Sequence, residues 1–193
     1  MNEFLGLFDF ICPIVDSSSI RLLKKFRVAL CLVLYMVSMA TAIANDVVLS
    51  GVVIRVMDGD TVELQTPQMQ SVHIRLAGID APEKNQDFGQ RAKQELTRLC
   101  FRQPTQADVR ALDRYGRTVA RVRCNGVDAA SKLLSGGLAW HFSRYAATQP
   151  KKEADDDREA QEMAKMSHQG LWSMPNPKAP WDWRAMQKSS SPP

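Results

Sequence analysis

The chain has 193 residues, of which 45% are hydrophobic, 24% charged and 7% aromatic, and its formal net charge is +4. This composition fits a globular protein of about one domain, and it excludes a chain that is disordered throughout. Four cysteines are too few for a small domain held together mainly by disulfides. The slight positive excess permits a polyanionic partner without identifying one. The function must therefore be inferred from sequence motifs.

Residues 1–44 have the layout of a targeting segment. A basic cluster at residues 21–27 precedes an apolar run that begins at Val28 and ends in small residues at Ala42-Ile43-Ala44, a pattern that signal peptidase accepts. We expect an N-terminal extension with a signal peptide, and hence a periplasmic or secreted protein. The alternative is a membrane anchor, because the run is about the minimum length that spans a bilayer.

Residues 45–172 contain the patterns of a folded domain. Strands are expected at 46–57, with a break at Gly51, and at 60–65, 71–79, 104–112 and 117–124; helices are expected at 86–101, 128–135 and 151–168. Five short strands with a helix after the third match an α+β, mainly β, fold: a five-stranded Greek-key barrel of the OB type with about three packed helices. Residues 173–193, rich in proline and serine, are expected to form a C-terminal tail.

Three short segments carry residues suited to chemistry on a phosphate group, and the first contains Asp58-Gly59-Asp60. Asp60 has the strand parity of Val62 and Leu64, so its side chain is expected on the apolar face. A carboxylate there is costly unless a cation or hydrogen-bond donors satisfy it. A simple hairpin turn is the alternative interpretation.

The second segment places Arg75 on a strand that runs into Asp80 and Glu83, with Pro82 between the two acids. A hard cation prefers several oxygen ligands, and two aspartates with a backbone carbonyl are a typical beginning of such a site. A surface cluster of ion pairs is the alternative interpretation.

The third segment places Arg114, Tyr115 and Arg117 on a turn that leads into a strand. Arginine offers a planar fork of donors that fits phosphate oxygens, and a neighbouring tyrosine can stack on a base or sugar. An exposed basic hairpin is the alternative interpretation.

Together the three segments supply what phosphodiester hydrolysis needs. Asp60 and Asp80 can hold a cation. Arg75 and Arg117 can bind the phosphate, and Glu83 can position or deprotonate water. The residues therefore favour a metal-assisted nuclease.

The segments V-x-D-G-D-T-V-x-L, R-L-x-G-I-D-A-P-E and D-R-Y-G-R resemble, in this order, those of the staphylococcal (micrococcal) nuclease family, and the resemblance extends from about Val47 to Trp172. It implies an OB-fold barrel that hydrolyses DNA and RNA with Ca²⁺ and little sugar specificity. Pro180-Trp-Asp-Trp-Arg184 is similar to the tails of many bacterial members.

The resemblance also implies roles for individual residues. The calcium ligands would be the carboxylates of Asp60 and Asp80 and the backbone carbonyl of Ala81, with Asp58 supporting them from outside. Glu83 would be the general base, and Arg75 and Arg117 would stabilise the transition state. The nucleotide would be bound by Arg114, Tyr115 and Tyr145. Ala81 and Ser143 depart from the prototype, which has threonine and tyrosine at these positions.

Two further expectations concern the state of the protein. Export to an oxidising compartment makes a Cys100–Cys124 disulfide a hypothesis, with two buried free thiols as the alternative. A monomer is expected, with DNA and RNA as substrates and no protein partner implied. The rival function is a catalytically inactive OB-fold module that binds single-stranded nucleic acid.

Overall fold

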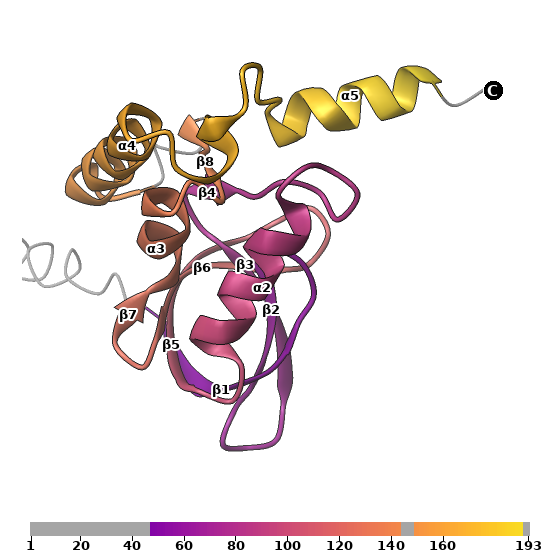
Figure 1. Ribbon diagram of the computed structural model, residues 1–193. Helices are drawn as coiled ribbons and strands as arrows, with labels where there is room; N and C mark the ends of the chain where they lie inside the picture. Colours follow the sequence, from indigo (N-terminus) through magenta and orange to yellow (C-terminus); the bar gives the residue numbers. More distant parts are fainter. Residues whose placement is uncertain (1–46, 144–148, 191–193) are drawn as a thin grey trace, which may run out of the picture. The chain divides into compact units, whose positions relative to one another are not determined.

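The computed structural model describes residues 47–143 and 149–190 (Figure 1). The signal-peptide prediction and Tyr145 lie outside these described residues. The structure described below belongs to one compact unit, residues 46–193. Within the described part of the chain, no helix is long and apolar enough to cross a membrane.

Five strands form a closed barrel, which confirms the OB-type prediction. They are β1 (Val48–Val56), β2 (Thr61–Gln65), β3 (Ser71–Leu76), β5 (Pro104–Leu112) and β6 (Thr118–Cys124). Their order in the sheet is β3-β2-β1-β5-β6 with antiparallel neighbours, and a parallel pairing of β3 with β6 closes the barrel. The short strand β7 (Val127–Asp128) pairs with β6 at the edge.

Alternating apolar residues of the strands fill the barrel. Val62, Leu64, Ile74 and Val122 are fully buried, and Leu76 is 1% exposed. Burying such a side chain stabilises the fold by about 1.5–3 kcal/mol. The expected break at Gly51 does not occur. Strand β1 continues through this residue and pairs with β5 before it and with β2 after it.

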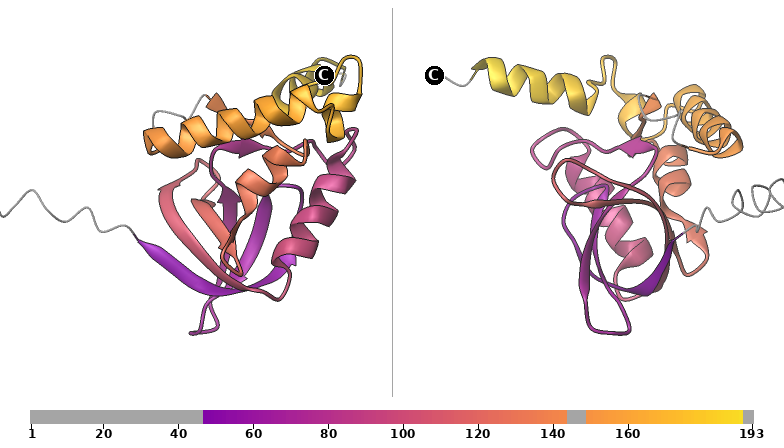
Figure 2. Two further views of the ribbon diagram at one scale, coloured as in Figure 1. Left: turned by 60° about the vertical axis from the view of Figure 1, so that its left-hand side comes forward. Right: turned by 180° about the vertical axis from the view of Figure 1, so that it is seen from behind.

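Four helices are described around the barrel: α2 (Gly89–Cys100), α3 (Ala129–Ser135), α4 (Lys151–Met166) and α5 (Pro180–Ser190), with a 3₁₀ turn, η2, at Gly170–Ser173. Figure 2 shows α2 along one side of the barrel and α4 across one end. Helix α2 begins at Gly89, later than the expected residue 86, because Phe88 has a left-handed backbone (φ 66°). Helix α5 lies within residues 173–193, which were expected to form only a tail.

The expected strand 71–79 is interrupted at Ala77-Gly78, and the two-residue strand β4 (Ile79–Asp80) turns away to pair with β8 (Trp140–His141). Gly78 has a φ of 79°, and a Cβ there would collide with the side chains of Gln149 and Asp157. This turn separates Arg75 and Asp80 onto different strands at the barrel end that α4 covers (Figure 1).

A disulfide joins Cys100, at the end of α2, to Cys124, at the end of β6. Both residues are fully buried, and their Cα atoms are 5.1 Å apart. The bond therefore ties the first helix to the barrel.

Candidate active site

Asp60, Arg75 and Asp80 meet at one end of the barrel. Asp60 directly precedes β2, whose first residue pairs with Arg75 of β3. The Arg75 guanidinium forms an ion pair with Asp60, and its Nη2 donates to Asp80 Oδ1 at 2.8 Å. The three side chains are only 9%, 16% and 2% exposed, in chain order. One guanidinium thus holds two nearly buried carboxylates close together.

Backbone and side-chain donors fix Asp60 in place. The N–H of Ala81 donates to Asp60 Oδ2 at 2.7 Å, and the Thr61 hydroxyl lies 3.2 Å from Oδ1. Asp58 acts from the preceding turn, where its Oδ1 accepts the N–H of Asp60 at 3.1 Å. The structure therefore shows Ala81 holding this carboxylate directly, while Asp58 holds the backbone of Asp60.

The environment of Asp60 disfavours a negative charge. Burial raises the pKa of Asp60 to about 7; Arg75 acts in the opposite direction, and the carboxylates of Asp58 and Asp80 add to the rise. A further cation beside Asp60 would favour its ionised form.

Glu83 lies in the loop between β4 and α2 and is 41% exposed. The loop packs closely on the start of α2, because a Cβ at Gly89 would collide with the Glu83 carbonyl. Gln86 closes the loop by accepting the Glu83 N–H at Oε1, 3.1 Å away. The side chain of Glu83 is thus held at the mouth of the site with access to solvent.

Arg184 of α5 contacts both acids of this segment. Its Nη1 lies 2.7 Å from Glu83 Oε1, and its Nη2 lies 2.7 Å from Asp80 Oδ2. Sequence reasoning missed Arg184 as a site residue. The only signal was its place in the Pro180–Arg184 motif, since composition had assigned the whole segment to a tail.

The chemistry of these residues fits a hard divalent cation. Asp60, Asp80 and Glu83 offer carboxylate oxygens, the ligand type that Ca²⁺ prefers. Within residues 47–143 and 149–190, no three His, Cys, Asp or Glu side chains already converge as a metal site. Instead Arg75 and Arg184 pair with these carboxylates. With all three acids ionised, one negative charge is in excess, or two if Arg184 withdraws.

The hairpin between β5 and β6 carries Arg114, Tyr115 and Arg117 together. Both guanidinium groups lie over the Tyr115 ring, 5.1 and 5.5 Å from its centre, and Tyr115 is 70% exposed. Exposed aromatic and cationic groups in contact suit stacking on a base and binding of a phosphate.

Asp113 organises this hairpin, a role that the sequence analysis did not assign. It accepts the backbone N–H of Tyr115 and of Arg117 at 2.8 and 2.9 Å, and Arg117 Nε at 2.7 Å. Burial acts to raise the pKa of Asp113, but the hydrogen bonds from Arg117 and Tyr115 outweigh it and hold the pKa below its ordinary value.

The structure brings the hairpin to β3 through the strand pairing that closes the barrel. Thr118, the residue after Arg117, pairs with Ile74, and Val119 pairs with Arg75. Arg117 itself forms an ion pair with Asp113, and the described contacts do not join it to Asp60, Asp80 or Glu83.

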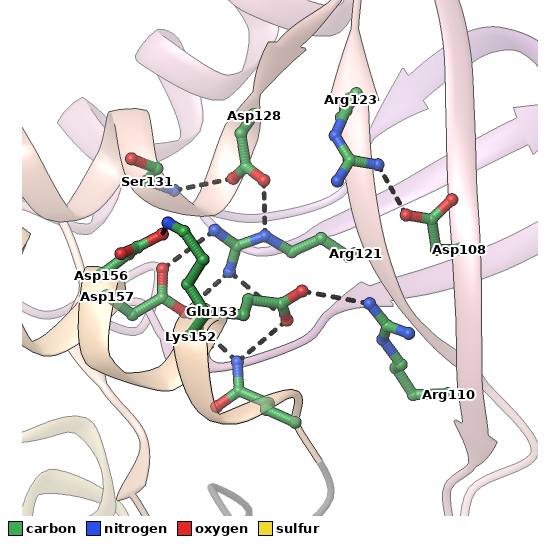
Figure 3. A network of polar contacts seen from close by, with 11 residues as sticks. Asp108, Arg110, Arg121, Arg123, Asp128, Ser131, Lys152, Glu153, Asp156 and Asp157 are labelled. Carbon is green, nitrogen blue, oxygen red and sulfur yellow. Dashed lines mark hydrogen bonds and ion pairs between the residues drawn. The ribbon is translucent and has the colours of Figure 1, made fainter.

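Figure 3 shows a second polar cluster, which is centred on Arg121. Arg121 of β6 is 5% exposed, and its two terminal nitrogens donate to the fully buried Asp157 of α4 at 2.7 and 2.9 Å. Its Nε donates to Asp128, and Gln149 Nε2 lies 3.2 Å from Asp157 Oδ2. Gln149 and Asp157 are the side chains packed against Gly78, so this cluster supports the turn between Arg75 and Asp80.

The chain is similar to a family of known proteins. A family model described as staphylococcal nuclease homologue matches residues 73–174. The micrococcal nuclease of Shigella flexneri is 35% identical over 152 residues, which cover 73% of this chain and 83% of that protein. Protein ParB of Escherichia coli is 36% identical over 147 residues, 70% of this chain and 79% of that protein. An uncharacterized endonuclease of Haemophilus influenzae is 33% identical over 136 residues, 70% of this chain and 73% of that protein. The chain belongs to the staphylococcal nuclease family.

Proposed function

We propose that this protein is a Ca²⁺-dependent nuclease that hydrolyses phosphodiester bonds of DNA and RNA with little sugar specificity. The nuclease homologues support the hydrolytic activity. One observation carries the finer proposal: two nearly buried aspartates share Arg75 beside an accessible glutamate. Holding two nearly buried carboxylates on one nearly buried guanidinium is costly, and a site built only to stabilise the fold has no need of that cost.

Asp60 and Asp80, with the backbone carbonyl of Ala81, are the residues that would hold the calcium ion. When bound, the ion supplies positive charge to the phosphate oxygens and offsets the charge that develops on them. Burial of the two aspartates suits this task, because low dielectric strengthens the attraction between an ionised carboxylate and a cation.

Arg75 and Arg117 provide the donors for the phosphate. Each guanidinium is held by carboxylates before substrate arrives, Arg75 by Asp60 and Asp80 and Arg117 by Asp113. Their forks are therefore oriented in advance, and donors aimed at developing charge stabilise a transition state more than a ground state.

Glu83 is the general base of the proposed reaction. Its carboxylate accepts a proton from the water that attacks phosphorus, and its exposure at the mouth of the site gives that water access. Arg114 and Tyr115, with Tyr145, bind the nucleotide beside the scissile bond. The exposed Tyr115 ring suits any base, because every base offers a stacking face.

Digestion assays test the proposal. Single-stranded DNA, duplex DNA and RNA are each incubated with the purified protein in Ca²⁺, in Mg²⁺ or in chelator. We expect cleavage of DNA and RNA in Ca²⁺ and none in chelator. Cleavage that persists in chelator would contradict the metal assignment. Binding of single strands without cleavage in Ca²⁺ would favour an inactive OB-fold module.

We further propose that the protein acts in the periplasm or outside the cell. The disulfide between Cys100 and Cys124 supports this location, since such bonds persist in oxidising compartments. Cell fractionation tests it: the protein is expected in the periplasmic or culture fraction. Recovery in the membrane fraction would indicate that the N-terminal segment is retained as an anchor.

A further inference from the structure

Arg184 places a positive charge on the carboxylates that the proposed nuclease reaction needs. Its Nη2 lies 2.7 Å from Asp80 Oδ2, and its Nη1 lies 3.3 Å from Asp80 Oδ1 and 2.7 Å from Glu83 Oε1. Asp80 is the expected cation ligand and Glu83 the expected base. Arg75 also donates to Asp80 Oδ1 at 2.8 Å, so both oxygens of Asp80 accept from guanidinium groups.

Contacts near the start of α5 hold Arg184 at this position. The ring of Trp181 lies 5.7 Å from that of Trp140, which is the strand partner of Asp80. It also lies 5.5 Å from the ring of Phe142. Just before the helix, the carbonyl of Lys178 accepts Gln86 Nε2 at 2.7 Å.

Gln86 therefore links the Glu83 loop to the segment just before α5, since its other amide atom accepts the Glu83 N–H. Figure 1 shows that the rest of α5 runs away from the barrel. The helix thus meets the site through its first turns, and residues 185–189 are exposed.

A divalent cation at Asp80 Oδ2 would stand against the guanidinium of Arg184, whereas the contact of Arg75 is with Oδ1. Like charges a few ångströms apart repel strongly, and the repulsion grows where burial lowers the dielectric. Arg184 is 43% exposed and residues 185–189, which follow it on α5, are exposed, so its side chain can turn into solvent. Asp80, at 2% exposure, cannot.

We propose that Arg184 is an internal counter-cation that covers Asp80 and Glu83 in the metal-free protein, and that a divalent cation must displace it from Asp80 to load the site. This inference rests on the proposed function. We call α5 with Arg184 the strap, because its contact with Asp80 would set the cation concentration that the nuclease requires.

The strap has two effects of opposite sign. In the metal-free protein, Arg184 stabilises the fold by neutralising a buried carboxylate. In the presence of cation, the same charge weakens cation binding. Loss of Arg184 should therefore lower the metal-free melting temperature and raise the affinity for Ca²⁺. A residue with a merely structural role would not give the second effect.

The test compares full-length wild type with R184M and K188M. Lys188 is an exposed basic residue of the same helix, so K188M removes the same charge away from the carboxylates. Calorimetric titration with CaCl₂ gives the dissociation constant, and thermal unfolding in chelator gives the metal-free melting temperature. We expect R184M to bind Ca²⁺ about tenfold more tightly than wild type and to melt at a lower temperature in chelator. K188M should match wild type in both.

Equal or weaker Ca²⁺ binding by R184M, with normal binding by wild type, overturns the strap and leaves the proposed nuclease function standing. Absence of Ca²⁺ binding by all three proteins overturns both proposals. An R184K variant adds a check if R184M fails to fold. Lysine keeps the charge but lacks the fork that bridges two acids, so R184K should bind Ca²⁺ with an affinity between those of wild type and an uncharged variant. An affinity equal to that of wild type would count against the bridging contact.

Discussion

At the scale of single residues, Arg75 has both a structural role and a role in the proposed reaction. The sequence predicts that Arg75 binds the phosphate, and the structure adds that it forms ion pairs with Asp60 and Asp80. This second role could not be predicted from spacing alone, because it depends on the turn at Gly78 that brings Asp80 back toward β3. Glu83 differs from Arg75, because its side chain is 41% exposed and is not part of the buried core.

Glu83→Gln should therefore separate catalysis from stability. The amide keeps the size of the side chain but cannot accept the proton of water, so turnover should fall by about 10²–10⁴-fold. The melting temperature should change little. The measurement is the rate of cleavage of a single-stranded oligonucleotide at saturating Ca²⁺. Glu159→Gln, the same change at an exposed position of α4, serves as the control. Turnover within a few-fold of wild type would remove Glu83 from the mechanism.

At the scale of elements, alternating apolar residues in the sequence predicted the barrel strands. The apolar pattern did not predict which face of α4 is buried. Apolar spacing in the sequence predicts that Ala160, Met163, Ala164 and Met166 lie on or near its buried stripe. That assignment is wrong for the two methionines, which are 56% and 76% exposed. The helix buries Ala154, Asp157, Gln161 and Ala164 instead. A charged residue at a core position could be predicted only by knowing that Arg121 faces it from β6.

The Arg121–Asp157 pair should matter more than any surface pair of the same helix. Asp157→Asn leaves a guanidinium that is 5% exposed without one of its counter-charges, so the free energy of unfolding should fall by about 2–4 kcal/mol. Asp156→Asn, which removes the exposed partner of Lys152, should change it by less than about 1 kcal/mol. Urea unfolding at neutral pH measures both. Equal losses from the two variants would show that burial of the pair contributes nothing.

The helix α5 was missed for a related reason. The proline and serine content of residues 173–193 predicted a tail, yet Pro180 stands at the first position of the helix, where a missing N–H costs nothing. Asp182 in the first turn and Lys188 in the last favour the helix dipole. Its contact with the site arises only in the folded protein, through Trp181 and Arg184.

At the scale of the whole molecule, the three motif segments are separated in the sequence and approach one another only once the barrel closes. The pairing of β3 with β6 brings the Arg117 hairpin to Arg75, and the turn after β3 returns Asp80 to Asp60. The spacing in the sequence predicts neither contact. What could be predicted was the family pattern and the chemistry of its residues.

The disulfide should stabilise the molecule without entering the chemistry. It closes a loop of sequence separation 24, and loss of such a cross-link lowers the free energy of unfolding by about 3 kcal/mol. A Cys100→Ala, Cys124→Ala double variant should therefore melt at a lower temperature but cleave DNA at the wild-type rate below it. Thiol titration of the denatured mature protein, from which cleavage of the signal peptide removes Cys12 and Cys31, gives the independent check. Reactive thiols at Cys100 and Cys124 would contradict the bond.

The central claim is that Asp60 and Asp80 hold the cation on which cleavage depends. Its most direct test is the rate of single-stranded DNA cleavage as a function of free Ca²⁺, for wild type and for Asp80→Asn. We predict that the wild-type rate rises from zero in chelator to a plateau, and that Asp80→Asn needs at least about tenfold more Ca²⁺ to reach half of its own plateau. A wild-type rate that is independent of Ca²⁺, or an identical Ca²⁺ requirement in both proteins, would contradict the claim.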